Sequence, residues 1–268
     1  ITTVSVFNLT ADTRVSVKNG DAVVVTAQVV EVNMDILSTN NFVADLSMLG
    51  GGIIVSADLF DSSTGIVTWN IASATVTEGQ QTVTVLTIYD EAGNTSNTLE
   101  TTFIGDNSVP SVLDVSIYNI SKSIEDYVKD GQSLVITAQI SENLPEYTTS
   151  HDIWADLSPL GMSTIVSADE FDTTTQIATW NVSSTVLNPS DGNLTITVSY
   201  RDEAGNAAPV GNESIIADNT PPIIVQISFV NNTEGWIDIA KNGDSMTVTA
   251  MITDSEGNVT RDEIWADL

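Results

Sequence analysis

Residues 17–29 read VKNGDAVVVTAQV, and this stretch decides the fold because it occurs two more times in the chain. It returns as VKDGQSLVITAQI at residues 128–140 and as AKNGDSMTVTAMI at residues 240–252. Lys129 follows its counterpart Lys18 by 111 residues, and Lys241 follows Lys129 by 112. A period near 110 residues is too long for a solenoid coil and has the size of a whole domain. The chain is therefore an array of similar domains.

Within the repeated stretch, apolar and polar residues alternate with a period of two. One face carries only apolar residues, which are Val23, Val25, Ala27 and Val29, then Leu134, Ile136, Ala138 and Ile140, then Met246, Val248, Ala250 and Ile252. The other face carries Thr26, Thr137 and Thr249. This pattern predicts an antiparallel strand with one face in the core and one in water.

About seven short strands fit into each period, separated by turn residues. This count predicts an all-β fold of tandem immunoglobulin-like β-sandwich domains. Trp69 and Trp180 occupy equivalent positions in the repeat, and we interpret both as core anchors.

The period divides the chain into two full domains, residues 1–108 and 109–220, and the N-terminal part of a third, incomplete domain, residues 221–268. The joints, GDNSVP at residues 105–110 and ADNTPP at residues 217–222, are short and contain proline. Proline stiffens a linker, so we expect domains joined end to end by short rigid linkers. The third copy stops before its counterpart of the Trp69 strand, so we expect further chain or a partner to complete it.

The charge balance limits the partners of the chain. Its 268 residues contain 7 Lys and Arg against 36 Asp and Glu, a net charge of −29. Such a chain repels phosphate backbones and anionic membranes, so nucleic-acid binding is excluded and cations are the expected partners. There is no cysteine and no apolar run of eighteen residues, so disulfides and direct membrane insertion of this segment are excluded as well.

The sequence offers few residues in arrangements suited to catalysis, and we expect no catalytic site. His151 is the only histidine, and it lies in a polar loop where the first unit has Asn40. Acid pairs such as Asp58 and Asp61 recur as Asp169 and Asp172, at the same turns of each unit. Their recurrence indicates shared architecture, whereas a catalytic pair is expected in one unit only.

The joint, the repeated strand, the ADLS segment and the DEAGN hairpin together resemble the Ig-like repeats of prokaryotic cell-surface proteins, most closely those of archaeal surface-layer proteins. This resemblance implies an extracellular, cell-surface location, self-assembly with copies of the same chain in a lattice or filament, N-linked glycans and a dependence on Ca²⁺. Two alternatives stay open: adhesin or stalk repeats that present a binding head, and accessory repeats of a secreted enzyme.

Calcium binding is the most specific function that the acidic turns predict, because Ca²⁺ takes six to eight oxygen ligands. We expect the DEAGN hairpin and the Asp-Asn joint to converge at one end of a domain. The candidate ligands in the first unit are Asp90, Glu91, Asp106 and Asn107, and those in the second are Asp202, Glu203, Asp218 and Asn219.

Asparagine sequons (N-x-S/T) predict attachment sites for N-linked glycans. Three of them, at Asn8, Asn119 and Asn231, recur in register at the end of the first strand of each unit. The others begin at Asn94, Asn181, Asn193, Asn212 and Asn258. The recurring lysines, Lys18, Lys129 and Lys241, are expected to form local salt bridges or to contact the acidic face of a neighbouring subunit.

Overall fold

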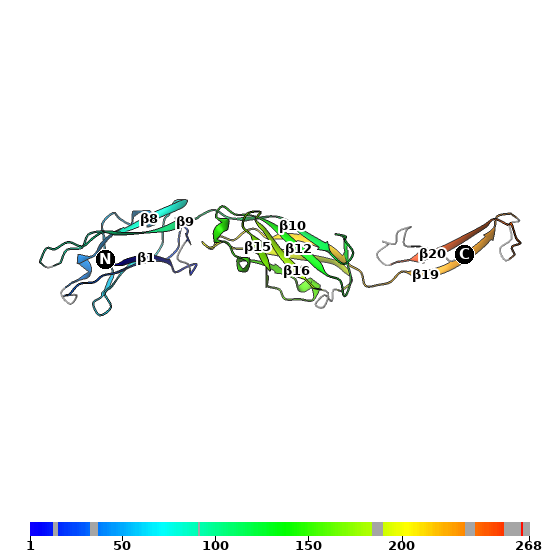
Figure 1. Cartoon of the computed structure of the whole chain (residues 1–268), viewed down its shortest axis with the longest axis horizontal. Coiled ribbons are helices and arrows are strands. Elements are labelled where there is room, and N and C mark those ends of the chain that lie inside the picture. The colour runs from blue at the N-terminus through cyan, green and yellow to red at the C-terminus, as the bar shows by residue number, and fades with distance from the viewer. Residues whose placement is uncertain are drawn as a thin grey trace.

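The structure is a computed structural model that describes residues 1–12, 16–32, 37–90, 92–183, 190–233, 239–254 and 264. Three β-rich bodies follow one another along its long axis (Figure 1). We call them unit 1, with strands between Thr3 and Gly105, unit 2, with strands between Ser111 and Ala217, and unit 3, with strands between Ile223 and Thr253. None of the described helical segments is long and apolar enough to span a membrane.

Unit 1 consists of two sheets. The first has the order β1-β3-β7-β6, with strands Thr3–Asn8, Val23–Gln28, Ile66–Ile71 and Leu59–Asp61. The second has the order β2-β9-β8-β4-β5, with strands Ser16–Val17, Leu99–Gly105, Gly79–Val85, Val43–Asp45 and Val55–Ser56. Strand β2 pairs in parallel with β9, whereas the other pairs are antiparallel.

Unit 2 repeats this arrangement strand for strand. Its first sheet has the order β10-β12-β16-β15, with strands Ser111–Asn119, Leu134–Ser141, Ile177–Val182 and Glu170–Asp172. Its second sheet has the order β11-β18-β17-β13-β14, with strands Tyr127–Val128, Gly211–Ala217, Gly192–Tyr200, Ile153–Asp156 and Val166–Ser167. The predicted all-β tandem Ig-like architecture is therefore confirmed.

Short 3-10 turns join the strands of both units, and all but η4 form equivalent pairs among the described residues. They are η2 (Thr39–Asn41) and η3 (Ser47–Leu49) in unit 1, and η4 (Pro145–Tyr147), η5 (Ser150–Asp152) and η6 (Ser158–Leu160) in unit 2. The turns η2 and η5 correspond, and the central residue of η5 is His151, which is exposed.

The cores lie where the period-two pattern predicts them. In β3 and β12 the apolar face is buried against the opposite sheet. Trp69 and Trp180 are each 1 % exposed, and their indole N–H groups donate to the carbonyls of Val55 (3.0 Å) and Val166 (2.9 Å) in the opposite sheet. Each tryptophan thus fills the core and links the two sheets, which confirms its interpretation as a core anchor.

Unit 3 consists of a two-stranded hairpin of β19 (Ile223–Asn231) and β20 (Met246–Thr253) among the described residues. The strand at 246–252 forms as predicted, but its apolar face is largely exposed, because no second sheet packs on it in the described part of the chain. The rest of the predicted third domain, residues 255–263 and 265–268, lies outside the described residues.

Candidate metal centre

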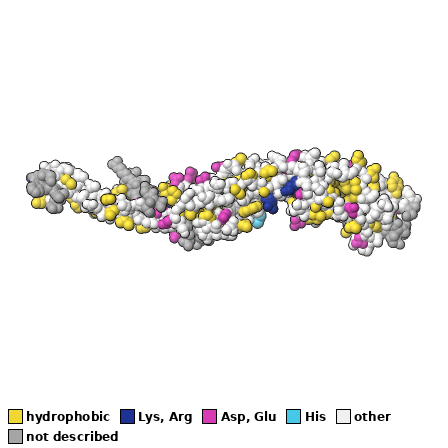
Figure 2. All heavy atoms as spheres, turned by 180° about the vertical axis from the view of Figure 1, so that it is seen from behind, with side chains coloured by type: hydrophobic (Ala, Val, Ile, Leu, Met, Phe, Trp, Pro, Cys, Tyr) yellow, Lys and Arg dark blue, Asp and Glu magenta, His cyan; other side chains and the backbone are white. Residues whose placement is uncertain are grey.

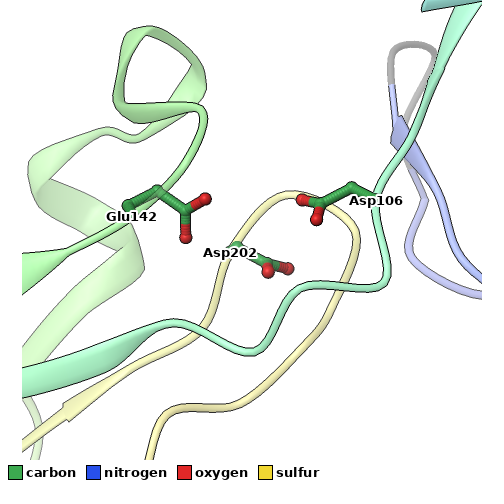
Figure 3. A group of neighbouring side chains, drawn as sticks. All are labelled: Asp106, Glu142 and Asp202. Atoms are coloured by element: carbon green, nitrogen blue, oxygen red, sulfur yellow. The ribbon is translucent and has the colours of Figure 1, made fainter. Parts of the chain in front are cut away.

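The first joint brings together three carboxylates from segments far apart in the sequence. Asp106 follows β9 at the end of unit 1, Glu142 follows β12, and Asp202 begins the hairpin after β17. One carboxylate oxygen from each lies within 4.8 Å of those of the other two. The three side chains point toward one another between the units (Figure 3). They are 2 %, 6 % and 7 % exposed, respectively, so this is a buried acidic cluster.

Asn206 fixes the position of Asp202 and ties it to the joint. The backbone N–H of Asn206 donates to Oδ1 of Asp202 (2.7 Å), and its Nδ2 donates to Oδ2 (2.9 Å). The same Nδ2 also donates to the backbone carbonyl of Asp106 (3.2 Å), across the boundary between the units. Asp106 in turn accepts a hydrogen bond at Oδ1 from the backbone N–H of Ser108 (3.1 Å).

Glu142 is held by neighbours of unit 2 alone. Its Oε1 accepts from the backbone N–H of Leu144 (3.0 Å), and its Oε2 accepts from the hydroxyl of Tyr200 (3.2 Å). The Tyr200 hydroxyl also shares a 2.6 Å hydrogen bond with Thr148. Hydrogen bonds to both of its oxygens thus orient the Glu142 carboxylate.

Burial makes the charged form of this cluster costly. Loss of solvent raises the pKa of Asp106 to about 6, and the negative charges of Asp202 and Glu142 add to the rise. Burial also raises the pKa of Asp202, while hydrogen bonds from Asn206 and the ammonium of Lys18 partly offset that effect. Three buried carboxylates this close together call for a positive charge between them.

The donor set fits a hard cation. All three side chains offer only oxygen, and carboxylates can bind one or two oxygens each, which suits the six to eight ligands of Ca²⁺. The set contains no thiolate or imidazole, which zinc and copper sites favour. The residues present therefore fit Ca²⁺, with Asp106, Glu142 and Asp202 as its candidate ligands.

Two of the predicted ligands, Asp106 and Asp202, meet in this cluster, but the predicted grouping is wrong. We expected Asp90 to join Asp106 and Asp202 to join Asp218, within one unit. The Asp90 hairpin instead precedes β9, whose far end, Gly105, leads into Asp106. A seven-residue strand spans about 20 Å, so hairpin and joint lie at opposite ends of unit 1. The hairpin of unit 2 therefore meets the joint that precedes it.

The other predicted ligands have different roles. Asn107 holds the joint to unit 1, because its Oδ1 accepts from the backbone N–H of Asn19 (2.7 Å) and its Nδ2 donates to the carbonyl of Val76 (3.2 Å). Asn219 repeats the first contact with Asp130 (2.7 Å). Asp218 accepts from Thr220 (3.0 Å), as Asp106 does from Ser108, and Glu203 is half-buried nearby. Glu91 lies outside the described residues.

Sequence reasoning missed Glu142 and Asn206. Glu142 follows the repeated strand by two residues, and Glu31 and Asp254 occupy the equivalent positions in the other copies. The sequence signal that could have identified Glu142 is an acidic residue two positions after the repeated strand in every unit. Asn206 ends the DEAGN segment, of which only the two acidic residues were predicted to take part in the site.

The recurring sequon positions are not glycan sites in this fold, which corrects the prediction for Asn8, Asn119 and Asn231. All three side chains are at most 1 % exposed. A glycan would replace a hydrogen on Nδ2, but both hydrogens are used. Asn119 donates to Tyr127 O (2.7 Å) and Gln132 Oε1 (2.8 Å). Asn8 bonds in the same way to Ser16 and Asp21, and Asn231 to Ile239 and Asp244.

The remaining sequons differ in their accessibility. Asn94, Asn181, Asn193 and Asn212 are exposed, so their glycosylation stays a prediction, and Asn258 lies outside the described residues. Asn94 Nδ2 donates to Oδ2 of Asp90 (2.6 Å) on the surface of unit 1.

No protein family model matches the sequence, and neither does any curated protein. Several solved structures resemble it weakly, including the following three. Fibronectin(III)-like modules of Clostridium thermocellum CbhA align with 81 % of this chain and 94 % of their own, at 14 % identity and a TM-score of 0.40. The C-terminal domain of the Streptococcus agalactiae AgI/II polypeptide BspA aligns with 81 % of this chain and 99 % of its own (12 %, 0.23). The Bacillus cereus major pilin subunit BcpA aligns with 94 % of this chain and 84 % of its own (13 %, 0.20).

Proposed function

We propose that this chain is part of an extracellular structural protein, a surface-layer or filament subunit, whose Ig-like units are held in line by Ca²⁺ at their joints. The buried acidic cluster carries this proposal. Its three carboxylates come from the joint and from two loops of unit 2, so one ion would connect the end of unit 1 to the start of unit 2.

The cluster explains why such a joint would respond to the ion. Without a cation, three negative charges oppose the close approach of Asp106 to unit 2, since each is largely removed from water. With Ca²⁺, the same groups become ligands and their repulsion turns into a cross-link. The joint would then change from a hinge into a stiff connection.

The tandem domains and the acidic charge of the chain support the proposals of self-assembly and a cell-surface location. A tandem array of small sandwiches provides length and many lateral surfaces, and 36 acidic residues attract cations to them. Divalent ions would also reduce repulsion between copies.

The test is calcium removal from the full chain, followed by calorimetry and small-angle X-ray scattering. In about 1 mM Ca²⁺ we expect a melting temperature several degrees higher than in chelator, because a ligand at 100 times its Kd stabilises by about 2.7 kcal/mol. The maximum dimension should also be longer and better defined with Ca²⁺.

Asp202→Asn and Asp90→Asn provide a matched pair of variants. Both residues begin a DEAGN hairpin, and both accept hydrogen bonds from the asparagine four residues later, but only Asp202 belongs to the acidic cluster. The Asp202→Asn variant should lose the calcium response and Asp90→Asn should keep it. Equal melting curves with and without Ca²⁺ in the wild type would refute a metal centre.

A further inference from the structure

A second feature of the first joint is a cavity of about 550 Å³ that opens between units 1 and 2. The loop Thr10–Asp12 and Lys18 line it from unit 1, and η5, β13 and the Asp202 hairpin line it from unit 2. Its volume lies in the range of sites for small ligands, about 300–1,000 Å³. The cavity shares Asp202 with the metal centre, and its other charged side chains belong neither to that centre nor to the sandwich cores.

Basic side chains, which are scarce in this chain, gather here. Lys18, Arg201 and His151 all line the cavity, although the whole sequence has only 7 Lys and Arg and one His. Figure 2 shows dark blue and cyan side chains together near the middle of the molecule. Lys18 reaches across the joint, because a Cβ on Gly205 of unit 2 would lie 3.2 Å from its Nζ.

The cavity also contains acceptors and a half-buried aromatic ring. Asp12, Asp152 and Glu203 line it beside the basic groups, and Trp154 contributes its indole. Asp152 is held in place by Thr149, whose N–H (2.7 Å) and hydroxyl (2.8 Å) both donate to it. The lining thus places donors and acceptors of both charges around an indole.

The residues that give the cavity this character depart from the repeat. The equivalents of His151, Trp154 and Arg201 in unit 1 are Asn40, Val43 and Tyr89, as the matching turns and strand pairs show. The scaffold therefore folds without these three side chains. Trp154 has a sequence counterpart in the third copy, Trp265. Their presence at one joint needs an explanation other than the fold.

We propose that this cavity binds a neutral saccharide unit. Sugar hydroxyls donate and accept hydrogen bonds at once, so a lining with ammonium, guanidinium and carboxylate groups can satisfy them. The C–H face of a pyranose ring packs on an indole, and the indole N–H adds a polar contact. A strongly anionic ligand would meet four carboxylates, since Asp202 lines the cavity as well, and a cationic one would meet Lys18 and Arg201, so the mixed charge favours a neutral ligand.

The test uses the labelled full chain, in Ca²⁺, on an array that carries neutral and acidic oligosaccharides. The key variant replaces His151→Asn, Trp154→Val and Arg201→Tyr, which are the residues that unit 1 has at these positions. We expect wild type to bind at least one neutral oligosaccharide, and the triple variant to lose at least tenfold in affinity by calorimetric titration. Lys129→Ala, which removes a basic group away from the cavity, should bind as wild type does.

Three results would overturn the proposal: no neutral oligosaccharide bound by wild type, binding of acidic glycans alone, or equal binding by the triple variant. Circular dichroism and the melting temperature check that the variant is folded. If it is not, the single variant Trp154→Val decides, because unit 1 folds with valine at the equivalent position. Wild-type affinity in the folded Trp154→Val variant would reject this cavity.

Discussion

At the scale of single residues, one buried asparagine connects three segments of every unit. Asn119 ends β10, donates to the backbone of β11, and reaches Gln132 in the turn before β12. Gln132 Oε1 also accepts from the backbone N–H of Lys129 (2.9 Å), so the amide closes the turn that carries the recurring lysine. The recurrence of Asn8, Asn119 and Asn231 is thus explained by the fold.

We expect Asn119→Ala to lower the free energy of unfolding by about 2 kcal/mol, because the partly buried carbonyl of Tyr127 loses this donor and the buried Oε1 of Gln132 loses one of its two donors. Urea unfolding of the full chain measures this change. Asn193→Ala removes an exposed asparagine of the same unit and should stay within about 0.5 kcal/mol of wild type. A similar loss in both variants would show that the buried amide has no special role.

The raised pKa of Asp106 predicts that stability depends on pH, in a direction that reverses when Ca²⁺ is present. Burial raises its pKa from 3.8 to about 6, so between these values the folded chain binds a proton that the unfolded chain does not. In chelator, this group's contribution to stability is present below about pH 4 and is lost as pH rises through about 6. With Ca²⁺ the order reverses, since protons compete with the ion and calcium stabilises only above that range.

Melting temperatures measured across this pH range, with Ca²⁺ and with chelator, should therefore give two curves that converge in acid. Asp106→Asn is the control, because the rest of the acidic surface titrates equally in both proteins. The difference between wild type and variant should isolate Asp106, and parallel curves for the two proteins would contradict its raised pKa.

At the scale of elements, the end of β9 is a point of close contact. A Cβ on Gly105 would collide with the backbone carbonyl of Thr77, which a flexible side chain cannot relieve. The equivalent residue in unit 2 is Ala217, which is fully buried, so the two units close this edge differently. We expect Gly105→Ala to destabilise unit 1 by about 2 kcal/mol or more.

Calorimetry should show this loss as a lower melting temperature for unit 1. Thr102→Ala, an exposed position of the same strand, should change it little. An unchanged transition in Gly105→Ala would mean that the Thr77 loop moves aside without cost.

The elements were largely predictable from sequence, and the site only in part. Alternation in residues 17–29 predicts which face of β3 is buried, and Trp69 marks the same face of the neighbouring strand β7. Asp106 meets Asp202 because of the way in which the end of unit 1 faces unit 2. The order of residues along the chain does not specify which loops meet at this joint. Asn8 looked like an exposed sequon because the burial of a polar side chain in a turn is decided by tertiary hydrogen bonds.

At the scale of the whole molecule, charge and length act together. The net charge of −29 is spread over three units arranged along one axis, so neighbouring copies repel one another at low ionic strength (Figure 1). Screening at physiological salt limits that repulsion to about 8 Å, and divalent ions reduce it further. Calcium would thus act both within a copy, at the joint, and between copies.

Calcium-dependent assembly is the prediction that follows at this scale. Electron microscopy of the natively expressed protein should show ordered sheets or filaments with about 1 mM Ca²⁺ and their loss in chelator. Asp202→Asn should weaken order because its joint stays loose, whereas Asp90→Asn should not. Monodisperse rods under all conditions would contradict self-assembly and favour stalk repeats that present a binding head. Ordered arrays that persist in chelator would instead show that lateral contacts suffice without a stiffened joint.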